Sequence, residues 1–446
     1  MNYLIRNADI ADFDTLKTTP KDIYIKDGYF KKITDHIDEK ECEEVTVIDA
    51  KHMMALPGFV DAHSHVYQTF IKGPLDDLCI TDWLVKLFHI EDVMSDEDYY
   101  YATYLSCLSA MRFGTTTINE MGDYQYIDAT LQAFEDAGMR VTFGVTSADV
   151  AENDATPLFT IDEALEISKT VYEKAHGRNN GLMRASVAPA GLPANSKEIM
   201  RALKKFADER GLIFHTHLGE GKMETENVAK VYNLQGEAEA LYSIGCMDEH
   251  TLLAHSIWLT DEELEIIRKS GATPVHCPNT NMKIADGIPK IAQMLKLGIP
   301  VAMGCDGEAS SATKDMIREA KAGSYLQKVV TLDPTVMDAG TCFKMMTING
   351  AKALGYNDLG LIKEGYQADL LLVRTDDDFS LTDQDHRVGN LLYAGTGHAV
   401  DTVFLKGDLK LQNKHFVGID EKAVLDKCNE LIHKLNVKAG YVKEEE

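Results

Sequence analysis

The chain has 446 residues, which is enough for one α/β barrel of about 250 residues or more together with a smaller domain. Its formal net charge of −26 argues against nucleic acid as a partner, because phosphate binding needs clustered lysine and arginine. No apolar run approaches the roughly 20 residues that span a bilayer, and the N-terminal residues lack the layout of a signal peptide.

The eight cysteines are scattered along the sequence, and no two of them form a Cys-x-x-Cys pair. This usage is typical of reduced thiols in the cytoplasm rather than of disulfides or a structural zinc cluster. Cys277 and Cys305 are interpreted as small buried packing residues. We therefore expect a cytoplasmic protein with neither a nucleic-acid nor a membrane partner. Its oligomeric state is open, and a homo-oligomer is possible.

Short β-like runs with turn signals fill the first 55 residues and return near the end of the chain, as in Ala368–Val373 and Asp401–Gly407. The pattern predicts one small β-sandwich domain built from both chain ends, residues 1–55 and 360–420. A helical pattern at Lys422–Leu435 predicts a C-terminal helix and tail over residues 421–446.

Between these ends, eight strand candidates alternate with amphipathic stretches such as Glu198–Arg210, Asp261–Lys269 and Ile288–Lys296. The alternation predicts a (β/α)8 TIM-type barrel over residues 56–359, with its active site at the carboxyl ends of the strands. The predicted strands are Ala55–Ala62, Gly114–Ile118, Val141–Val145, Met183–Ala188, Leu212–His217, Thr251–Ala254, Ala272–His276 and Pro300–Gly304.

The first predicted barrel strand ends in His63-Ser64-His65. Side chains at i and i+2 of a strand point to the same side, so both imidazoles can face one metal ion. Three later strands end in His217, followed by Glu220, then His255, and then Asp306. A carboxylate such as Asp306 is costly to bury without a metal or an imidazolium. These strand ends together predict a metal-dependent hydrolase.

The same residues resemble the amidohydrolase superfamily, and in particular the branch that contains the S-adenosylhomocysteine/methylthioadenosine deaminases and the triazine hydrolases. The resemblance runs over nearly the whole chain and implies one divalent metal held by His63, His65, His217 and Asp306. Binuclear members carry a bridging lysine on the fourth strand, and residues 183–191 here contain no lysine. A mononuclear site is therefore favoured, with zinc expected and iron or manganese also acceptable to these ligands.

The resemblance also implies how such a site works. The metal lowers the pKa of a water molecule to about 7, and Asp306 and His255 would orient that water and take its proton. Glu220 would protonate the ring nitrogen beside the attacked carbon, and ammonia would leave. Because a simple amide hydrolase does not need this ring-protonating acid, Glu220 favours an aminohydrolase.

Five further residues are candidates for substrate binding. Gln68 either hydrogen-bonds the substrate or caps a loop, and Trp83 either packs the loop after the first strand or stacks on a base. In the adenosine-type deaminases, the glutamate that matches Glu91 is associated with ribose hydroxyls, and otherwise Glu91 is an exposed charge at a helix end. After the seventh strand, His276 or Asn279 is a candidate for ligand contact.

Two departures from the adenosine-type deaminases bear on the substrate. Ala190 stands where those enzymes carry a histidine, and Gly307-Glu308-Ala309 lacks their asparagine pair. We therefore expect deamination of an amino-substituted nitrogen heterocycle, with S-adenosylhomocysteine, methylthioadenosine or adenosine in first place. The alternatives are a free base, a pterin or an s-triazine, then a cyclic amide, and last a barrel without catalytic activity.

Overall fold

The computed structural model describes residues 1–151 and 156–443. The chain divides into two compact units, each assembled from three stretches. The first comprises Met1–Asp61, Leu108–Thr117 and Lys314–Glu421, and the second comprises Ala62–Cys107, Ile118–Thr313 and Lys422–Glu446. The domain boundaries expected from the sequence (1–55 with 360–420, 56–359, and 421–446) stay a prediction.

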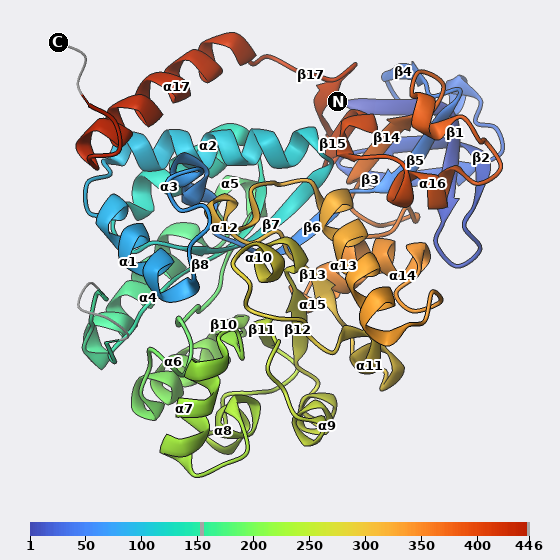
Figure 1. The fold of residues 1–446 in the computed structure, drawn as a ribbon. Helices are drawn as coiled ribbons and strands as arrows, with labels where there is room; N and C mark the ends of the chain where they lie inside the picture. The colour runs from blue at the N-terminus through green and yellow to red at the C-terminus, as the bar shows by residue number, and fades with distance from the viewer. Residues whose placement is uncertain (152–155, 444–446) are drawn as a thin grey trace. The chain divides into compact units, whose positions relative to one another are not determined.

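In the described part of the chain, the first unit contains a mixed nine-stranded sheet in the order β17-β16-β15-β14-β5-β1-β2-β3, with β4 beside β1. Strand β5 pairs antiparallel with β14, so that Leu56 lies opposite Leu371 (Figure 1). The two chain ends therefore meet in one β domain, as the sequence predicts. The strands are β1 (Asn2–Asp12), β2 (Lys17–Lys26), β3 (Tyr29–Thr34), β4 (Val45–Asp49), β5 (Met53–Pro57), β14 (Leu370–Arg374), β15 (Val400–Leu405), β16 (Asp408–Gln412) and β17 (His415–Phe416).

Alternate side chains of these strands form the core of the sheet. Ile23 and Ile25 of β2 pack with Leu370 and Leu372 of β14 and with Phe404, all fully buried. This spacing of two is what a strand with one buried face requires. The helical segments of this unit are η1 (Glu39–Glu41), α13 (Met316–Thr331), α14 (Ala339–Lys344), η3 (Met345–Asn349), α15 (Gly350–Ala353), η4 (Phe379–Leu381), α16 (Arg387–Tyr393) and η5 (Gly397–Ala399).

In the described residues, eight strands form the barrel in two four-stranded sheets, ordered β6-β7-β8-β9 and β10-β11-β12-β13. A parallel bridge between Val187 and Phe214 joins one sheet to the next, and the N–H of Asp306 donates to the carbonyl of His63 at 2.8 Å. The predicted α/β barrel is therefore confirmed. The strands are β6 (Phe59–Ser64), β7 (Thr115–Gly122), β8 (Arg140–Val145), β9 (Met183–Ala185), β10 (Phe214–Leu218), β11 (Thr251–His255), β12 (Thr273–His276) and β13 (Ala302–Met303).

The predicted strand Ala55–Ala62 is in fact two strands, and this part of the prediction is wrong. Strand β5 ends at Pro57 within the mixed sheet, and β6 begins at Phe59 within the barrel. Gly58 lies between them, where a Cβ atom would come within 2.2 Å of the Thr116 hydroxyl. The residue at the switch must therefore be glycine, and β6 is left to carry the two histidines.

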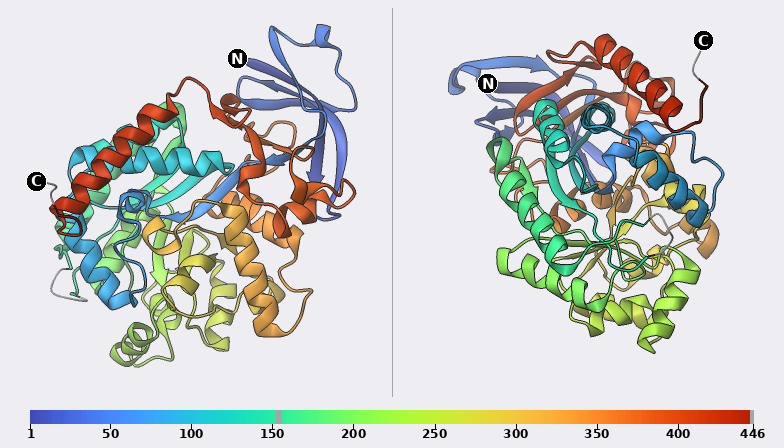
Figure 2. Two further views of the ribbon diagram at one scale, coloured as in Figure 1. Left: turned by 45° about the horizontal axis from the view of Figure 1, so that its top comes forward. Right: turned by 90° about the vertical axis from the view of Figure 1, so that its left-hand side faces the viewer.

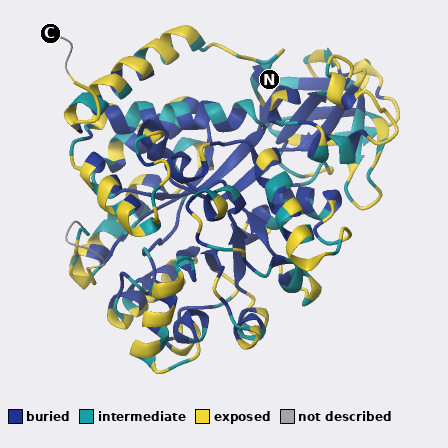
Figure 3. Cartoon of the chain, viewed as in Figure 1, coloured by how far each residue is buried: buried dark blue, intermediate teal, exposed yellow. Residues whose placement is uncertain are grey.

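Helices surround the barrel strands, and their apolar faces are buried while their outer faces are exposed (Figure 3). Helix α6 (Lys197–Arg210) buries Ile199, Leu203 and Phe206, begins with the Ser196 side chain as N-cap and ends at Gly211, whose φ is +63°. The others are η2 (Val66–Ile71), α1 (Ile80–Glu91), α2 (Asp96–Arg112), α3 (Ile127–Ala137), α4 (Ile161–Ala175), α5 (Arg178–Gly181), α7 (Lys222–Tyr232), α8 (Glu237–Ser243), α9 (Asp261–Ser270), α10 (Pro278–Lys283), α11 (Ile291–Lys296) and α12 (Glu308–Ser311).

The C-terminal helix α17 (Glu421–Lys438) lies along α2, as Figures 1 and 2 both show. Its buried Cys428, Leu431 and Leu435 pack in one cluster with Tyr99 and Ala102 of α2. The amphipathic pattern of the sequence therefore gives a helix that covers an element of the second unit. In the part of the chain that the structure describes, no helix has the length and apolarity needed to cross a membrane.

Candidate metal centre and active site

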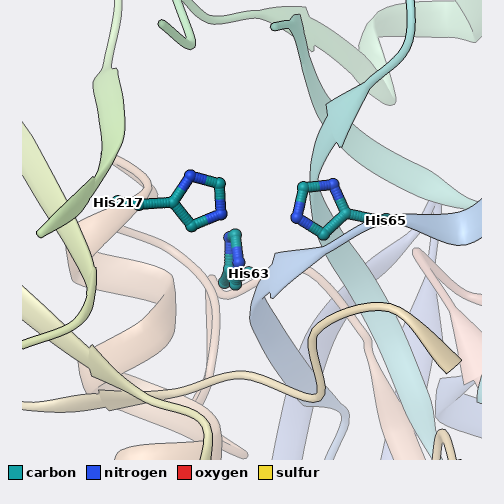
Figure 4. Close-up of side chains that lie close together, drawn as sticks. All are labelled: His63, His65 and His217. Carbon is teal, nitrogen blue, oxygen red and sulfur yellow. The ribbon is translucent and has the colours of Figure 1, made fainter. Parts of the chain in front are cut away.

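Strand β6 carries His63 and ends just before His65, so the spacing of two brings both rings to the same side. Both side chains are buried. Figure 4 shows the rings of His63, His65 and His217 turned toward a common point. The ligand nitrogens of these three histidines all lie within 4.8 Å of one another. The structure therefore brings together the three predicted histidine ligands from β6 and β10.

Asp306, which follows β13, completes the group. Its Oδ1 atom lies 3.3 Å from Nε2 of His63 and 3.5 Å from Nε2 of His65. Two ligands of a tetrahedral metal at bond lengths of about 2.1 Å are separated by about 3.4 Å. The spacing and the donor set of three imidazoles and one carboxylate therefore fit a single divalent metal such as zinc.

Outer contacts orient two of the rings. The Nδ1 atom of His65 lies 2.6 Å from the carbonyl oxygen of Met121, and Nδ1 of His217 lies 2.6 Å from that of Ala190. Because a carbonyl only accepts, each Nδ1 carries the hydrogen and donates it. The Nε2 atoms are left unprotonated and face inward, as metal-binding histidines require.

The charge states also suit metal binding. Burial lowers the pKa of His217, and lowers that of His63 well below its usual value, so both rings stay neutral. Burial alone would raise the pKa of Asp306, but His63, His255 and His65 around it hold that pKa well below the usual range. The cluster therefore presents neutral imidazoles beside an ionised carboxylate.

His255 and Glu220 lie beside this group of three histidines and Asp306. The Nε2 atom of His255 is 3.5 Å from Oε1 of Glu220, and its Nδ1 is 3.0 Å from Oδ1 of Asn281. His255 and Asp306 both adopt left-handed backbone conformations, with φ of +68° and +63°. Such strain in non-glycine residues persists only where the surrounding structure holds it, and it clusters at functional sites.

A cavity of about 900 Å³ opens onto these residues. His65, His217, Glu220 and Asp306 form part of its wall. The wall also includes the start of the chain after β6, helices α1, α7 and α10, and the loops after β7, β8 and β9. A cavity of this volume is large enough for a drug-sized ligand. The catalytic candidates therefore sit in a space that a substituted heterocycle can enter.

The structure divides the five predicted substrate-binding residues into two groups. Gln68, Trp83 and Glu91 line the cavity and are buried. Glu91 accepts a hydrogen bond of 2.7 Å from the Tyr67 hydroxyl, so it is not the exposed helix-end charge of the alternative interpretation. Among the described residues that line the cavity, His276 and Asn279 are absent. Their role stays a prediction.

Four site residues were missed by sequence reasoning. Asp123 and Ser310 line the cavity, Asn281 contacts His255, and Asn119 lies 3.0 Å from Nδ1 of His215. The Ser310 hydroxyl donates to Oδ2 of Asp306 at 3.2 Å. A signal existed for Asp123, which follows strand β7 at the barrel end that carries the site, and for Ser310, which lies about one helical turn after Asp306.

His215 contacts His63, one of the candidate metal ligands, on the side away from the cluster. Its Nε2 atom lies 3.0 Å from Nδ1 of His63, and its ring is fully buried. With His63 bound to a metal through Nε2, its Nδ1 carries the hydrogen and donates it to His215. His215 is therefore a hydrogen-bonded core histidine in a position to orient the ring of His63.

Replacing His215 by phenylalanine keeps a ring in place but removes the acceptor for His63. We expect the metal affinity to fall by about 10- to 100-fold, the usual cost of losing an outer contact to a ligand. Competition with a chelator measures this affinity, and circular dichroism checks the fold. A folded His215→Phe protein with unchanged metal affinity would contradict the role in orientation.

Comparisons with known proteins match most of the chain. Residues 54–410 match the amidohydrolase family. The 5-methylthioadenosine/S-adenosylhomocysteine deaminase of Carboxydothermus hydrogenoformans is 31% identical over 96% of this chain and 97% of its own length. The 5'-deoxyadenosine deaminase of Methanosphaera stadtmanae is 33% identical over 94% of this chain and 96% of its own length.

A solved structure agrees in fold over almost the whole chain. The adenosine deaminase of Xanthomonas campestris, described with bound zinc, superposes with a TM-score of 0.88 at 25% identity and covers 98% of each chain. The predicted resemblance is confirmed, because the family match and the relatives both extend over most of the sequence. The chain belongs to the amidohydrolase family.

Proposed function

We propose that this protein is a metal-dependent aminohydrolase that removes the exocyclic amino group of a nitrogen heterocycle and releases ammonia. The observation that carries the proposal is the position of Glu220. Its carboxylate lies 3.5 Å from His255, beside the cluster of three histidines and Asp306, and it lines the cavity. Deamination of a ring needs an acid that protonates the ring nitrogen beside the attacked carbon, and hydrolysis of a simple amide bond does not.

We assign the metal to His63, His65, His217 and Asp306, with zinc as the metal named for the solved relative. Such an ion supplies Lewis-acid chemistry, because it lowers the pKa of a water molecule to about 7. In this assignment Asp306 and His255 hold the attacking water and accept its proton. The hydrogen bonds of Asp306 with Ser310 and of His255 with Asn281 fix the directions of these two groups.

Glu220 acts on the substrate in this proposal. It protonates the ring nitrogen next to the attacked carbon, so that addition of water leaves no negative charge on the ring. The proton that Asp306 and His255 take from the water then passes to the amino group, which departs as ammonia. The hydroxyl proton of the adduct returns to Glu220 as the carbonyl forms. General acid catalysis of this kind contributes about 10²- to 10⁴-fold to a rate.

Adenosine-type compounds are the leading substrates, in particular methylthioadenosine, S-adenosylhomocysteine, 5'-deoxyadenosine and adenosine. The names of the relatives support this class, as does a cavity of about 900 Å³ that exceeds the needs of a free base. Glu91 is proposed to face the ribose hydroxyls, with Gln68 and Trp83 on the same wall. Ala190, which lines the cavity in place of a histidine, keeps a free base, a pterin or an s-triazine as the second candidate.

The remaining predictions about the protein's setting belong with this proposal. We propose that its partner is a small-molecule substrate and that it acts in the cytoplasm. We also propose that it has no nucleic-acid or membrane partner, and the net charge of −26 argues against nucleic acid. A homo-oligomer is compatible with the proposal. Size-exclusion chromatography with light scattering measures its subunit number.

Ammonia release tests the proposed reaction directly. Metal-replete protein is incubated with adenosine, methylthioadenosine and S-adenosylhomocysteine, and ammonia is measured with a coupled assay. We expect turnover of at least one of these compounds, with loss of the adenine absorption spectrum. One equivalent of bound metal without ammonia from any of them would overturn the adenosine class and direct the search to free bases, pterins and s-triazines.

A further inference from the structure

The charges that line the cavity are one-sided. Besides the candidate metal ligands, and besides Glu220 and Glu237, the described lining contains the carboxylates of Glu91, Asp123, Glu198 and Glu224. Lys197 is the one lysine or arginine in this described lining. The stretch that the structure leaves undescribed inside the chain, residues 152–155, reads Glu-Asn-Asp-Ala and holds no basic residue. No lysine or arginine from that stretch can therefore balance these carboxylates.

The single lysine does little to offset this charge. The Nζ atom of Lys197 lies 3.8 Å from Oε1 of Glu198, and both side chains are more than half exposed. Solvent screens the charges of such an exposed pair, and the positive and negative charges together contribute little to the field farther away. The field inside the cavity is therefore set by the carboxylates that remain, of which Glu91 and Asp123 are buried.

Glu91 and Asp123 belong to one buried wall. Glu91, at the end of α1, is held by the Tyr67 hydroxyl, and Asp123, after β7, accepts from the N–H of Gln125 at 2.8 Å. Tyr67 stacks on Tyr99 with ring centroids 5.4 Å apart. Burial together with the charges of Asp123 and Glu91 raises the pKa of Tyr99. Both carboxyls line the cavity on this side.

The two carboxyls repel each other as anions. Burial and the neighbouring charge of Asp123 raise the pKa of Glu91 to about 8, and burial raises the pKa of Asp123 to about 6. At pH 7 Asp123 is therefore ionised while Glu91 holds its proton. A cationic group on the ligand relieves this repulsion, and an anionic group adds to it.

We infer that the cavity selects heterocycles whose part beyond the reacting ring is uncharged or cationic, and that Asp123 and Glu91 are the residues that determine this specificity. The inference rests on the proposed deamination for the reacting end of the substrate. It narrows the substrate class, because a remote part with a net negative charge, such as a lone carboxylate or a phosphate, is disfavoured. The homocysteine part of S-adenosylhomocysteine carries an ammonium beside its carboxylate and has no net charge, so this compound stays within the class.

Three nucleosides of nearly equal size test the inference: adenosine, the cation 5'-amino-5'-deoxyadenosine and the anion adenosine-5'-carboxylic acid. We expect kcat/KM for the anion to be at least about 10-fold below that for adenosine, since a single charge near a buried carboxylate is worth about that much. The cation is expected to match or exceed adenosine. An anion that is turned over as well as adenosine overturns the inference.

Isosteric variants assign the effect to residues. The penalty on the anion is the ratio of kcat/KM for adenosine to kcat/KM for the anion. Asp123→Asn is expected to lower this ratio by at least about 3-fold. Glu91→Gln is expected to lower it less, because Glu91 is protonated at pH 7. The matched control is Asp128→Asn, which removes an exposed carboxylate paired with Lys174 outside the cavity and should leave the ratio unchanged. A general loss of stability moves all three substrates together and leaves the ratio unchanged. An unchanged ratio in Asp123→Asn overturns the assignment to this residue.

Calorimetric binding separates a failure of this inference from a failure of the proposed reaction. If none of the three nucleosides releases ammonia, the adenosine-type reaction fails, and the affinities of the same three compounds are measured instead. Weaker binding of the anion than of the other two still supports charge selection. Equal affinities, or binding of none of the three, overturn it.

Discussion

Replacement of Glu220 by glutamine is expected to lower kcat by about 10³-fold while the protein keeps its full metal content. Glutamine has the size and the acceptor oxygen of glutamate but cannot supply a proton. The carboxylate lies 3.5 Å from His255 on the cavity side, and its side chain is 22% exposed against 6% for Asp306. A general acid must be accessible to the substrate, and the exposure of Glu220 meets this requirement. The buried position of Asp306 suits a metal ligand instead.

The measurement also resolves an ambiguity in the cluster. Glu220 forms, with His217 and His255, a second group whose ligand atoms lie within 4.8 Å of one another. If Glu220 were a metal ligand, Glu220→Gln would lose metal as well as activity. Metal content and single-turnover kinetics, measured on the same preparation, separate the two roles.

The exposed Glu226 of α7 provides the control, because Glu226→Gln makes the same chemical change on a residue outside the described cavity lining. Its kcat should equal that of the wild-type protein. Full activity of Glu220→Gln would remove this residue from the acid role and would leave the deaminase mechanism without a ring-protonating group.

The grouping of the candidate metal ligands could be predicted from the sequence because these residues occupy a regular geometry. His63 and His65 share one side by the spacing of two. His217 and His255 lie at the carboxyl ends of β10 and β11, Asp306 follows β13, and the carboxyl ends of these strands meet at one edge of a barrel. Knowledge of the strand order alone therefore brings these residues together. No long-range contact has to be known in advance.

The surrounding contacts could not be predicted in this way. His215 reaches His63 because it lies one layer deeper in the barrel, and Asn119 meets it from β7. Such partners depend on how strands stagger against one another, and a single sequence does not encode that directly. The same holds for the division of β5 from β6 at Gly58. The nearby Thr116 side chain leaves no room for a Cβ atom at this position.

The substrate wall is the least predictable part, since it is built from loops. Glu91 was found through the resemblance, whereas Asp123 was not, although it lines the same cavity. After β12, the sequence names His276 and Asn279 as candidates, and their role stays a prediction. The structure brings Thr280 of α10 to the cavity and Asn281 of the same helix to His255.

Replacement of His217 by alanine is expected to abolish stable metal binding, with an affinity loss greater than the 100-fold that bounds outer-contact changes. His217 supplies one of three inward-facing imidazoles, and its Nδ1 is already committed to the Ala190 carbonyl. Alanine removes one of the four protein donors of the proposed set, so a direct metal bond is lost and not only an outer contact.

Metal content by elemental analysis and the shift of the melting temperature on addition of zinc measure this loss. A ligand present at 1,000 times its Kd stabilises a folded protein by about 4.1 kcal/mol, so the wild-type protein should gain a large shift and His217→Ala almost none. The control is His250→Ala, which removes an exposed histidine outside the cluster and should behave as wild type. Wild-type metal content in a folded His217→Ala protein would remove His217 from the ligand set and would require another donor. In that case the group of His63, His255 and Asp306, whose ligand atoms also lie within 4.8 Å of one another, would become the centre to test next.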